Sequence, residues 1–423
     1  MTYDVVIRGG EIVDGTGSGP RRADVAIQGD RIALVGDVSE DAALVIDASG
    51  RIVTPGFVDI HAHMDAQVMW DPMASSPCWH GITTMLNGNC GLSLAPVRPE
   101  EASFLVKLLE SVEDIPAKAI LAGTRFTGGS FGDYLDTLDG LPMGINVASL
   151  VGHTAVRYLA MGERSMEEAA DPTEEELQVM CESVREAMRN GAFGFSTSRS
   201  LLHSTPDGRK VPGTFAGLDE LMAFGQVIEQ AGHGIFGWVS AVESADPEPH
   251  RRDIEMMRRI SLETGCAFTF AVVQIRDNPK LYRELLDQIS EANAGGARLS
   301  PQTEVRSVGV VVGLQNITPF DQSDAWLALK KLSIEERLAA LRDPERRAEL
   351  VRAGNKVADE ARLSMIYRLV VNDGDARYDF SEDNSLWAIA KHRGVSPADA
   401  FVDSVVESDG EACFIFPFAN YDI

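Results

Sequence analysis

The chain has 423 residues, of which 44% are hydrophobic and 24% are charged, a balance typical of folded globular proteins rather than disordered or fibrous ones. Its 64 Asp and Glu residues outnumber its 38 Lys and Arg residues and give a formal net charge of −26. A surface this acidic repels phosphate backbones and anionic lipids, so nucleic acid and membrane surfaces are excluded as favoured partners.

The N-terminus, MTYDVVIRGGEIVDG, lacks the basic patch and apolar core of a signal peptide, and no run of about 18 apolar residues follows it. We therefore expect a cytoplasmic protein. The five cysteines are widely scattered and form no C-x-x-C pair, so no disulfide framework is predicted.

Residues 1–55 are predicted to form a small β-sandwich unit, or its N-terminal part. The evidence is a series of short strand-like runs separated by Gly-rich turns such as GGEIVDGTGSG. The expected strands are Val5–Arg8, Asp24–Ile27, Arg31–Val35 and Val45–Asp47.

Residues 56–304 alternate apolar runs of strand length with amphipathic helical segments, which predicts parallel β/α units. One helix is expected to begin at a capping box of Thr173 and Glu176 and to end before Gly191. The strand candidates number seven, and they are residues 57–63, 82–88, 145–151, 192–198, 235–240, 267–274 and 298–304.

A closed (β/α)8 barrel needs eight strands. We therefore predict an α/β fold of the TIM-like barrel type, truncated at its C-terminus so that the eighth strand is missing. Residues 305–423 are predicted to form an insertion, partly loop and partly charged helix, that leads toward this strand, with one helix starting at Asp343–Pro344. The first and seventh barrel strands would then be open edges, which favours self-association.

The clearest candidates for chemistry are His61 and His63, which follow the apolar run 57–60. Residues two apart on a strand face the same way, so both imidazoles can reach one metal ion. A purely structural pair is the alternative. The position at the end of the first barrel strand favours metal binding, because barrel active sites are built at the C-terminal ends of the strands.

Cys90 lies in the run Asn87-Gly88-Asn89-Cys90-Gly91 after the second barrel strand. A thiolate is a strong zinc ligand, and glycines on both sides allow the backbone to turn sharply. A buried structural cysteine is the commoner fate of a free Cys. The His pair one β/α unit earlier favours a metal ion shared by all three residues.

These motifs resemble those of a known family. The run TPGFVDIHAHMD behind a glycine-rich β unit resembles the amidohydrolase superfamily, and NGNCGLS resembles the cysteine-ligand signature of its D-aminoacylase branch. The runs INVASLVGHTAVRYLAMG and GAFGFSTS are similar to the third- and fourth-strand regions of the same branch. The resemblance covers most of residues 3–240.

The resemblance implies a barrel flanked by a small β-sandwich, one tightly held zinc ion, and zinc-activated water that hydrolyses the amide bond of N-acyl-D-amino acids. Carried over by position, His61, His63 and Cys90 would be the metal ligands. No Lys stands in 145–151 or 192–198, which favours the cysteine-bridged type over two metals bridged by a carboxylated lysine.

The sequence departs from the family pattern in two ways. The family places one His on strand five and one on strand six, but 235–240 and 267–274 contain none, so a second metal ion is not expected. The family's general base is an Asp on strand eight, which we expect beyond residue 423. Asp422 does not lie at a strand tip and is not assigned that role.

Four further polar residues follow the third and fourth strands and could reach the barrel mouth, where they would contact the substrate: His153, Arg157, Arg199 and His203. An arginine there could pair bidentately with a substrate carboxylate, with loop salt bridges as the alternative. Asp65 could orient a ligand histidine as a hydrogen-bond acceptor.

Two other hypotheses stay open at this point. The chain could be a related amidohydrolase that opens cyclic amides or removes other N-acyl groups. It could also be a truncated homologue without catalysis, retained as a binding or assembly protein.

Overall fold

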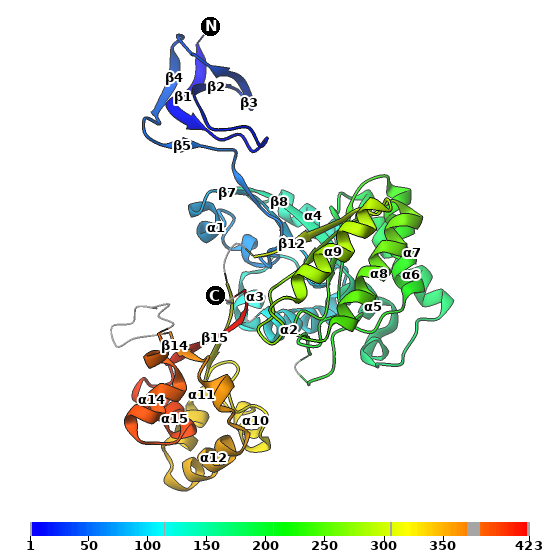
Figure 1. The fold of residues 1–423 in the computed structure, drawn as a ribbon. Helices are drawn as coiled ribbons and strands as arrows, with labels where there is room; N and C mark the ends of the chain where they lie inside the picture. Colours follow the sequence, from blue (N-terminus) through cyan, green and yellow to red (C-terminus); the bar gives the residue numbers. More distant parts are fainter. Residues whose placement is uncertain (1, 114, 206, 305–306, 370–380, 421–423) are drawn as a thin grey trace.

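A computed structural model describes residues 2–113, 115–205, 207–304, 307–369 and 381–420. Figure 1 shows three parts that follow one another along the chain: an N-terminal sheet in blue, a parallel sheet with its helices, and a helical part in yellow to red. Each part has its own cluster of buried apolar side chains. The predicted boundaries after residues 55 and 304 stay predictions. Ala419, which follows the second boundary, packs in the middle cluster.

The N-terminal sheet has five strands in the order β3-β2-β1-β4, with β5 pairing on β1. All four predicted strands are present, but the first is longer than expected. It continues through Gly9 and Gly10, where the register shifts as in a β-bulge. A side chain at Gly10 would lie 2.5 Å from Val53 Cγ2, so the glycine permits close strand approach rather than a turn. The strands are β1 (Tyr3–Ile12), β2 (Arg21–Gln28), β3 (Arg31–Gly36), β4 (Ala42–Asp47) and β5 (Ile52–Val53).

The middle sheet consists of the seven predicted barrel strands in sequence order, β12-β11-β10-β9-β8-β7-β6, and every neighbouring pair is parallel. The predicted TIM-like α/β fold is thus confirmed as a curled parallel sheet. Its strands are β6 (Phe57–Asp59), β7 (Ile82–Asn87), β8 (Asn146–Gly152), β9 (Gly194–Ser198), β10 (Ile235–Val239), β11 (Ala267–Ala271) and β12 (Leu299–Gln302).

Helices follow these strands and cover the sheet (Figure 1). The capping box of Thr173 and Glu176 starts α6 as predicted, and α7 ends at Gly232 in the left-handed region. The α-helices of this part are α1 (Ser75–Trp79), α2 (Ala102–Glu113), α3 (Ala117–Gly123), α4 (Phe131–Asp139), α5 (His153–Met161), α6 (Glu174–Arg189), α7 (Leu218–Ala231), α8 (Pro247–Thr264) and α9 (Leu281–Ala294), with 3-10 turns at Gln67–Met69, Pro99–Glu101 and Gly162–Met166.

The C-terminal part was predicted to contain loop and helix. It also contains a three-stranded sheet in the order β13-β15-β14, which the prediction missed. This sheet is antiparallel and does not extend the barrel sheet. The helix predicted at Asp343–Pro344 is present, with the Asp343 carboxylate as its N-cap. The elements are β13 (Val308–Gly313), α10 (Asp324–Lys330), α11 (Ile334–Arg342), α12 (Pro344–Val357), α13 (Glu360–Leu363), β14 (Tyr367–Arg368), a 3-10 turn (Glu382–Asn384), α14 (Leu386–Arg393), α15 (Pro397–Glu407) and β15 (Cys413–Ala419).

In the described ranges, β6 and β12 each pair with a single strand, so both ends of the barrel sheet are edges. Phe57 and Val58 on β6 are exposed. The self-association expected from these edges stays a prediction. A membrane-crossing segment would have to be both long and apolar, and no helix among the described residues meets both conditions.

The N-cap of α6 offers a direct test of local stability. Thr173→Ala removes the hydroxyl that accepts a hydrogen bond from the Glu176 amide, so we expect the free energy of unfolding to fall by about 1 kcal/mol. Thr173→Ser keeps the acceptor and should stay close to the wild type. Urea unfolding followed by circular dichroism measures both variants, and equal stability of Thr173→Ala and the wild type would contradict the expectation.

Candidate metal centre

His61, His63 and Cys90 meet because the two strands that precede them are parallel neighbours. In the register of β6 and β7, Asp59 lies opposite Met85. The segments that follow the two strands then leave the sheet at the same edge. The Ala62 amide still donates to the Leu86 carbonyl at 3.1 Å. The residues after the strands therefore emerge side by side, as the sequence predicts.

The three side chains converge closely. One ligand atom from each of His61, His63 and Cys90 lies within 4.8 Å of the others. The shortest approach is 3.2 Å between His61 Nε2 and Cys90 Sγ. Two imidazoles and a thiol make a donor set suited to zinc, so the residues present fit such an ion.

Cys90 owes its position to a strained turn held from the neighbouring strand. It is a non-glycine residue with a positive φ of 57°, between Gly88 and Gly91. The Gly91 amide donates to Ser196 Oγ at 3.1 Å, and that hydroxyl donates in turn to the Gly88 carbonyl. Any side chain at Gly88 would lie 2.0 Å from the Leu150 carbonyl oxygen. The turn therefore requires glycine at residue 88 and is held in place by β9.

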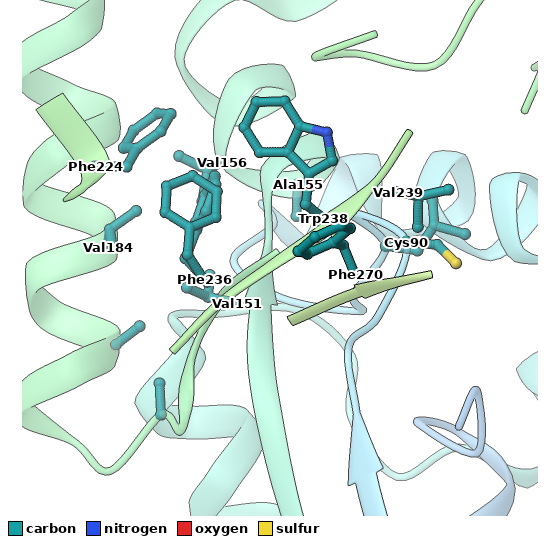
Figure 2. Packing of buried hydrophobic residues seen from close by; sticks show 14 of the residues in the cluster. Cys90, Val151, Ala155, Val156, Val184, Phe224, Phe236, Trp238, Val239 and Phe270 are labelled. Carbon is teal, nitrogen blue, oxygen red and sulfur yellow. The ribbon is translucent and has the colours of Figure 1, made fainter. Parts of the chain in front are cut away.

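The sulfur of Cys90 lies at the edge of the apolar core. Figure 2 shows the residue beside the packed cluster, with its sulfur directed away from the rings of Phe224 and Phe236. Burial raises the pKa of the Cys90 thiol well above its ordinary value, and the charges of Glu113, Asp65 and Glu304 add to the rise. These negative charges disfavour the Cys90 thiolate when no metal ion is bound, but they attract a cation to the site.

The His61 ring is held from the opposite edge of the sheet. Its Nδ1 lies 3.2 Å from Nε2 of Gln302, at the end of β12, while the Gln302 Oε1 is buried without a hydrogen-bond partner. A half-turn of the amide places Oε1 against Nδ1 as an acceptor. A proton on Nδ1 then leaves the Nε2 lone pair directed toward Cys90, as a metal ligand requires.

His63 has one nitrogen beside a carboxylate and one without a partner. Its Nε2 lies 3.4 Å from Glu113 Oε1, and its Nδ1 is buried with no hydrogen bond. Burial lowers the pKa of both His61 and His63 to about 4, so both rings are neutral at pH 7 and able to bind a cation.

Asp65 is almost wholly buried, and neither of its carboxylate oxygens has a hydrogen-bond partner. Burial raises its pKa to about 7, with a smaller contribution from the charge of Glu113. The Tyr134 hydroxyl donates to the Asp65 backbone carbonyl at 3.0 Å. The orientation of a ligand histidine by Asp65 stays a prediction.

His203 lies close enough to this group to interact with it electrostatically. Burial lowers the pKa of His203 to about 4, and the nearby His63 and His61 add to the effect. Its Nδ1 is 2.8 Å from Ser198 Oγ, at the end of β9. Of the four residues predicted to contact a substrate, His203 is the one that the structure brings toward the three candidate ligands.

His153 and Arg157 lie in an internal network instead. His153 is fully buried between Thr197 Oγ1, at 2.8 Å from Nδ1, and Glu220 Oε1, at 2.7 Å from Nε2. Arg157 donates to the same Glu220 oxygen at 3.0 Å and to the carbonyls of Ser165 and Ala170. The structure gives both side chains protein partners, and their contact with a substrate stays a prediction.

Arg199 pairs with a buried carboxylate. Its Nε lies 3.0 Å from Asp253 Oδ1 without the alignment of a hydrogen bond, its guanidinium stacks over the Trp238 ring at 5.9 Å, and its Nη1 donates to the Ala216 carbonyl. Burial raises the pKa of Asp253, and the charge of Arg199 opposes that rise. Contact between Arg199 and a substrate likewise stays a prediction.

The tips of the fifth and sixth strands carry no histidine, as the sequence indicates. Ser240 follows β10, and Gln274 lies beyond β11, where it exchanges hydrogen bonds with Asn420. Asp422 lies outside the described residues.

Sequence reasoning missed Glu113, Gln302 and Glu220, for which no local pattern gives a signal. The three consecutive hydroxyl residues 196–198 could have indicated that this strand end makes polar contacts, such as the hydrogen bond of Ser196 to the turn at Cys90.

The sequence profile of the amidohydrolase family matches residues 44–389, which is most of the chain. The chain belongs to the amidohydrolase family. This amidohydrolase is also 37% identical over 196 residues to a D-aminoacylase of Alcaligenes xylosoxydans xylosoxydans, covering 46% of this chain and 37% of that protein. An N-acyl-D-aspartate deacylase of the same organism is 32% identical over 295 residues, 69% of this chain and 54% of that protein.

An uncharacterized protein of Mycobacterium tuberculosis is 37% identical over 227 residues, or 51% of the amidohydrolase chain and 36% of its own length. The chain thus spans roughly a third to a half of these curated relatives. A crystal structure of N-acyl-D-glutamate deacylase from Bordetella bronchiseptica, complexed with zinc and a phosphonate inhibitor, is 25% identical. It has a TM-score of 0.64 and covers 99% of this chain and 72% of that one. The resemblance to the D-aminoacylase branch is confirmed.

The buried network of Glu220 predicts a pH dependence of stability. Burial alone would raise the pKa of Glu220, but His153 and Arg157 hold it below its ordinary value of 4.5. Burial also lowers the pKa of His153 below 6.5. The unfolded chain therefore binds more protons in acid, and stability should fall as the pH drops below 6.5 for His153 and below 4.5 for Glu220.

Glu220→Gln leaves Arg157 without its charged partner, and we expect the free energy of unfolding at pH 7 to fall by about 3 kcal/mol. The variant should also lose the part of the pH dependence below 4.5. Urea unfolding between pH 3 and 7 tests this, with the exposed Glu229→Gln on the same helix as control. Parallel curves for Glu220→Gln and the wild type would argue against the network.

Proposed function

We propose that this amidohydrolase hydrolyses the amide bond of N-acyl-D-amino acids with a zinc ion bound by His61, His63 and Cys90. The single observation that carries the proposal is the convergence of one ligand atom from each residue within 4.8 Å. The convergence lies at the C-terminal edge of the parallel sheet, where barrel enzymes build their active sites.

Two relatives support the substrate class. The D-aminoacylase and the N-acyl-D-aspartate deacylase both carry names that denote removal of an acyl group from a D-amino acid. The deacylase structure with zinc and a phosphonate that mimics the tetrahedral intermediate supports zinc as the metal. Hydrolysis of an acyl group is therefore favoured over the opening of cyclic amides.

A zinc ion held by the three residues would supply a Lewis acid for the amide carbonyl and lower the pKa of a bound water toward about 7. The chain's residues prepare this site. Cys90 gives up its thiol proton on binding the ion, and the thiolate reduces the charge left in the buried site. Gln302 holds the His61 ring by its Nδ1, so that Nε2 keeps its direction.

We propose one zinc ion rather than two, because neither 235–240 nor 267–274 contains the histidine expected on strands five and six. His203 is neutral at pH 7 because its pKa lies near 4, so it offers a bound substrate a hydrogen bond rather than a charge. We propose that Arg199, which directly follows β9, binds the carboxylate of the amino acid. A general base is not assigned among the described residues.

The proposal is tested by incubating the zinc-loaded protein with N-acetyl-D-amino acids, N-acetyl-L-amino acids and a hydantoin. We expect release of free amine from the D-series. Faster opening of the hydantoin would favour the cyclic-amide activity. Absence of turnover on every compound would contradict the proposed hydrolysis and favour a binding or assembly role.

Cys90→Ala should abolish the metal site, because it removes the thiolate and leaves two imidazoles. We expect zinc affinity to fall by at least about a hundredfold, with a matching loss of amide hydrolysis. Zinc content after dialysis, measured by elemental analysis, checks the first effect. The half-buried Cys181→Ala on α6 is the matched control and should keep its zinc. Equal zinc content in both variants would show that Cys90 is no ligand.

A further inference from the structure

We infer that Glu113 is a fourth protein ligand of the metal centre, in addition to the two histidines and Cys90. The inference rests on the metal site of the proposed function, but it does not require amide hydrolysis. Glu113 is the last residue of α2 and was not indicated by any sequence motif. Its carboxylate contacts the His63 ring.

The first support is geometric. Glu113 Oε1 lies 3.4 Å from His63 Nε2. Two ligand atoms at about 2.0–2.1 Å from a tetrahedral zinc lie about 3.4 Å from each other, so this separation equals one edge of the coordination tetrahedron. The carboxylate is not among the three atoms that lie within 4.8 Å of one another, so it has to rotate toward the ion on binding.

The second support is electrostatic. Glu113 places a carboxylate beside His63, one of the three side chains that converge on the candidate site. A thiolate and one carboxylate neutralise a divalent cation, and a buried site stabilises a neutral group of charges better than a charged one. The Glu113 carboxylate and the Cys90 thiolate together thus neutralise the two positive charges of a zinc ion.

The third support is the place of Glu113 at the C-terminal end of α2, where its negative charge is unfavourable. The negative end of the helix dipole lies there, and acidic residues are stabilising at the opposite end. A cation beside the carboxylate removes this cost. Asp65 is the competing carboxylate, because both of its oxygens are buried without a hydrogen-bond partner.

A fourth protein ligand changes how the site works. A catalytic zinc leaves one position to water or substrate, whereas four protein ligands close the site. The Glu113 side chain is 20% exposed, so it has room to swing outward. Glu113 would therefore close the site at rest and leave when a substrate carbonyl or water takes its position.

The test compares zinc affinity in the full chain by competition with a chelator. Glu113→Gln keeps the side-chain size and removes the charge, and we expect zinc binding to weaken by at least about tenfold. The matched control is Glu110→Gln, one turn earlier on α2, whose side chain accepts a hydrogen bond from the Ala117 amide and should keep wild-type affinity. Circular dichroism of the metal-free proteins verifies that both variants fold.

A second readout is the visible spectrum of the cobalt-loaded protein, which reports the number and type of ligands. We expect Glu113→Gln to alter this spectrum, while Glu110→Gln and His203→Ala leave it unchanged. Wild-type zinc affinity and an unaltered spectrum in Glu113→Gln would overturn the inference, as would a changed spectrum in His203→Ala with none in Glu113→Gln. Zinc binding without amide hydrolysis would contradict the proposed function but not the inference about Glu113.

Discussion

The parallel pairing of β6 with β7 is the constraint on which the rest of the centre depends. It brings the His pair and the cysteine turn to one edge of the sheet, although His63 and Cys90 lie 27 residues apart in the sequence. The pairing alone is not sufficient, because the thiol must also point at the imidazoles. The positive φ of Cys90 and the double hydrogen bond of Ser196 supply that direction.

Unsatisfied polar groups around the three candidate ligands show that the fold gives up stability there. His63 Nδ1, both carboxylate oxygens of Asp65 and Gln302 Oε1 are buried without hydrogen-bond partners. Each such group costs about 1–3 kcal/mol in a folded protein. Violations of this kind concentrate at functional sites, where a ligand or a moving side chain provides the compensation. Glu220 Oε2, Asp253 Oδ1 and Arg199 Nε are also buried without hydrogen-bond partners, although each of the two carboxylates pairs with an arginine.

Much of the fold could be predicted from the sequence because its signals are local. Seven apolar runs of strand length, alternating with amphipathic helical segments, predicted all the strands of the barrel sheet. The second sheet was missed because its order depends on distant pairing: Val308–Gly313 pairs with a strand about a hundred residues later, at Cys413–Ala419. The run Val308–Gly313 contains four valines, a strand signal that the prediction of loop and helix did not use.

The same distinction applies to the site. His61, His63 and Cys90 could be found because each follows a strand within a few residues, so their positions depend on one local element. Glu113 and Gln302 approach the centre from a helix end and from the far edge of the sheet, and only the tertiary fold shows this. His153 and Arg157 also follow a strand, but only the tertiary fold shows that both bond to the buried Glu220.

X-ray absorption at the zinc edge of the protein loaded with one equivalent of zinc shows whether Cys90 binds the ion. We expect one sulfur in the first coordination shell at about 2.3 Å, together with nitrogen and oxygen ligands at about 2.0–2.1 Å. A first shell of nitrogen and oxygen alone would contradict this expectation, because Cys90 would then lie outside the coordination sphere.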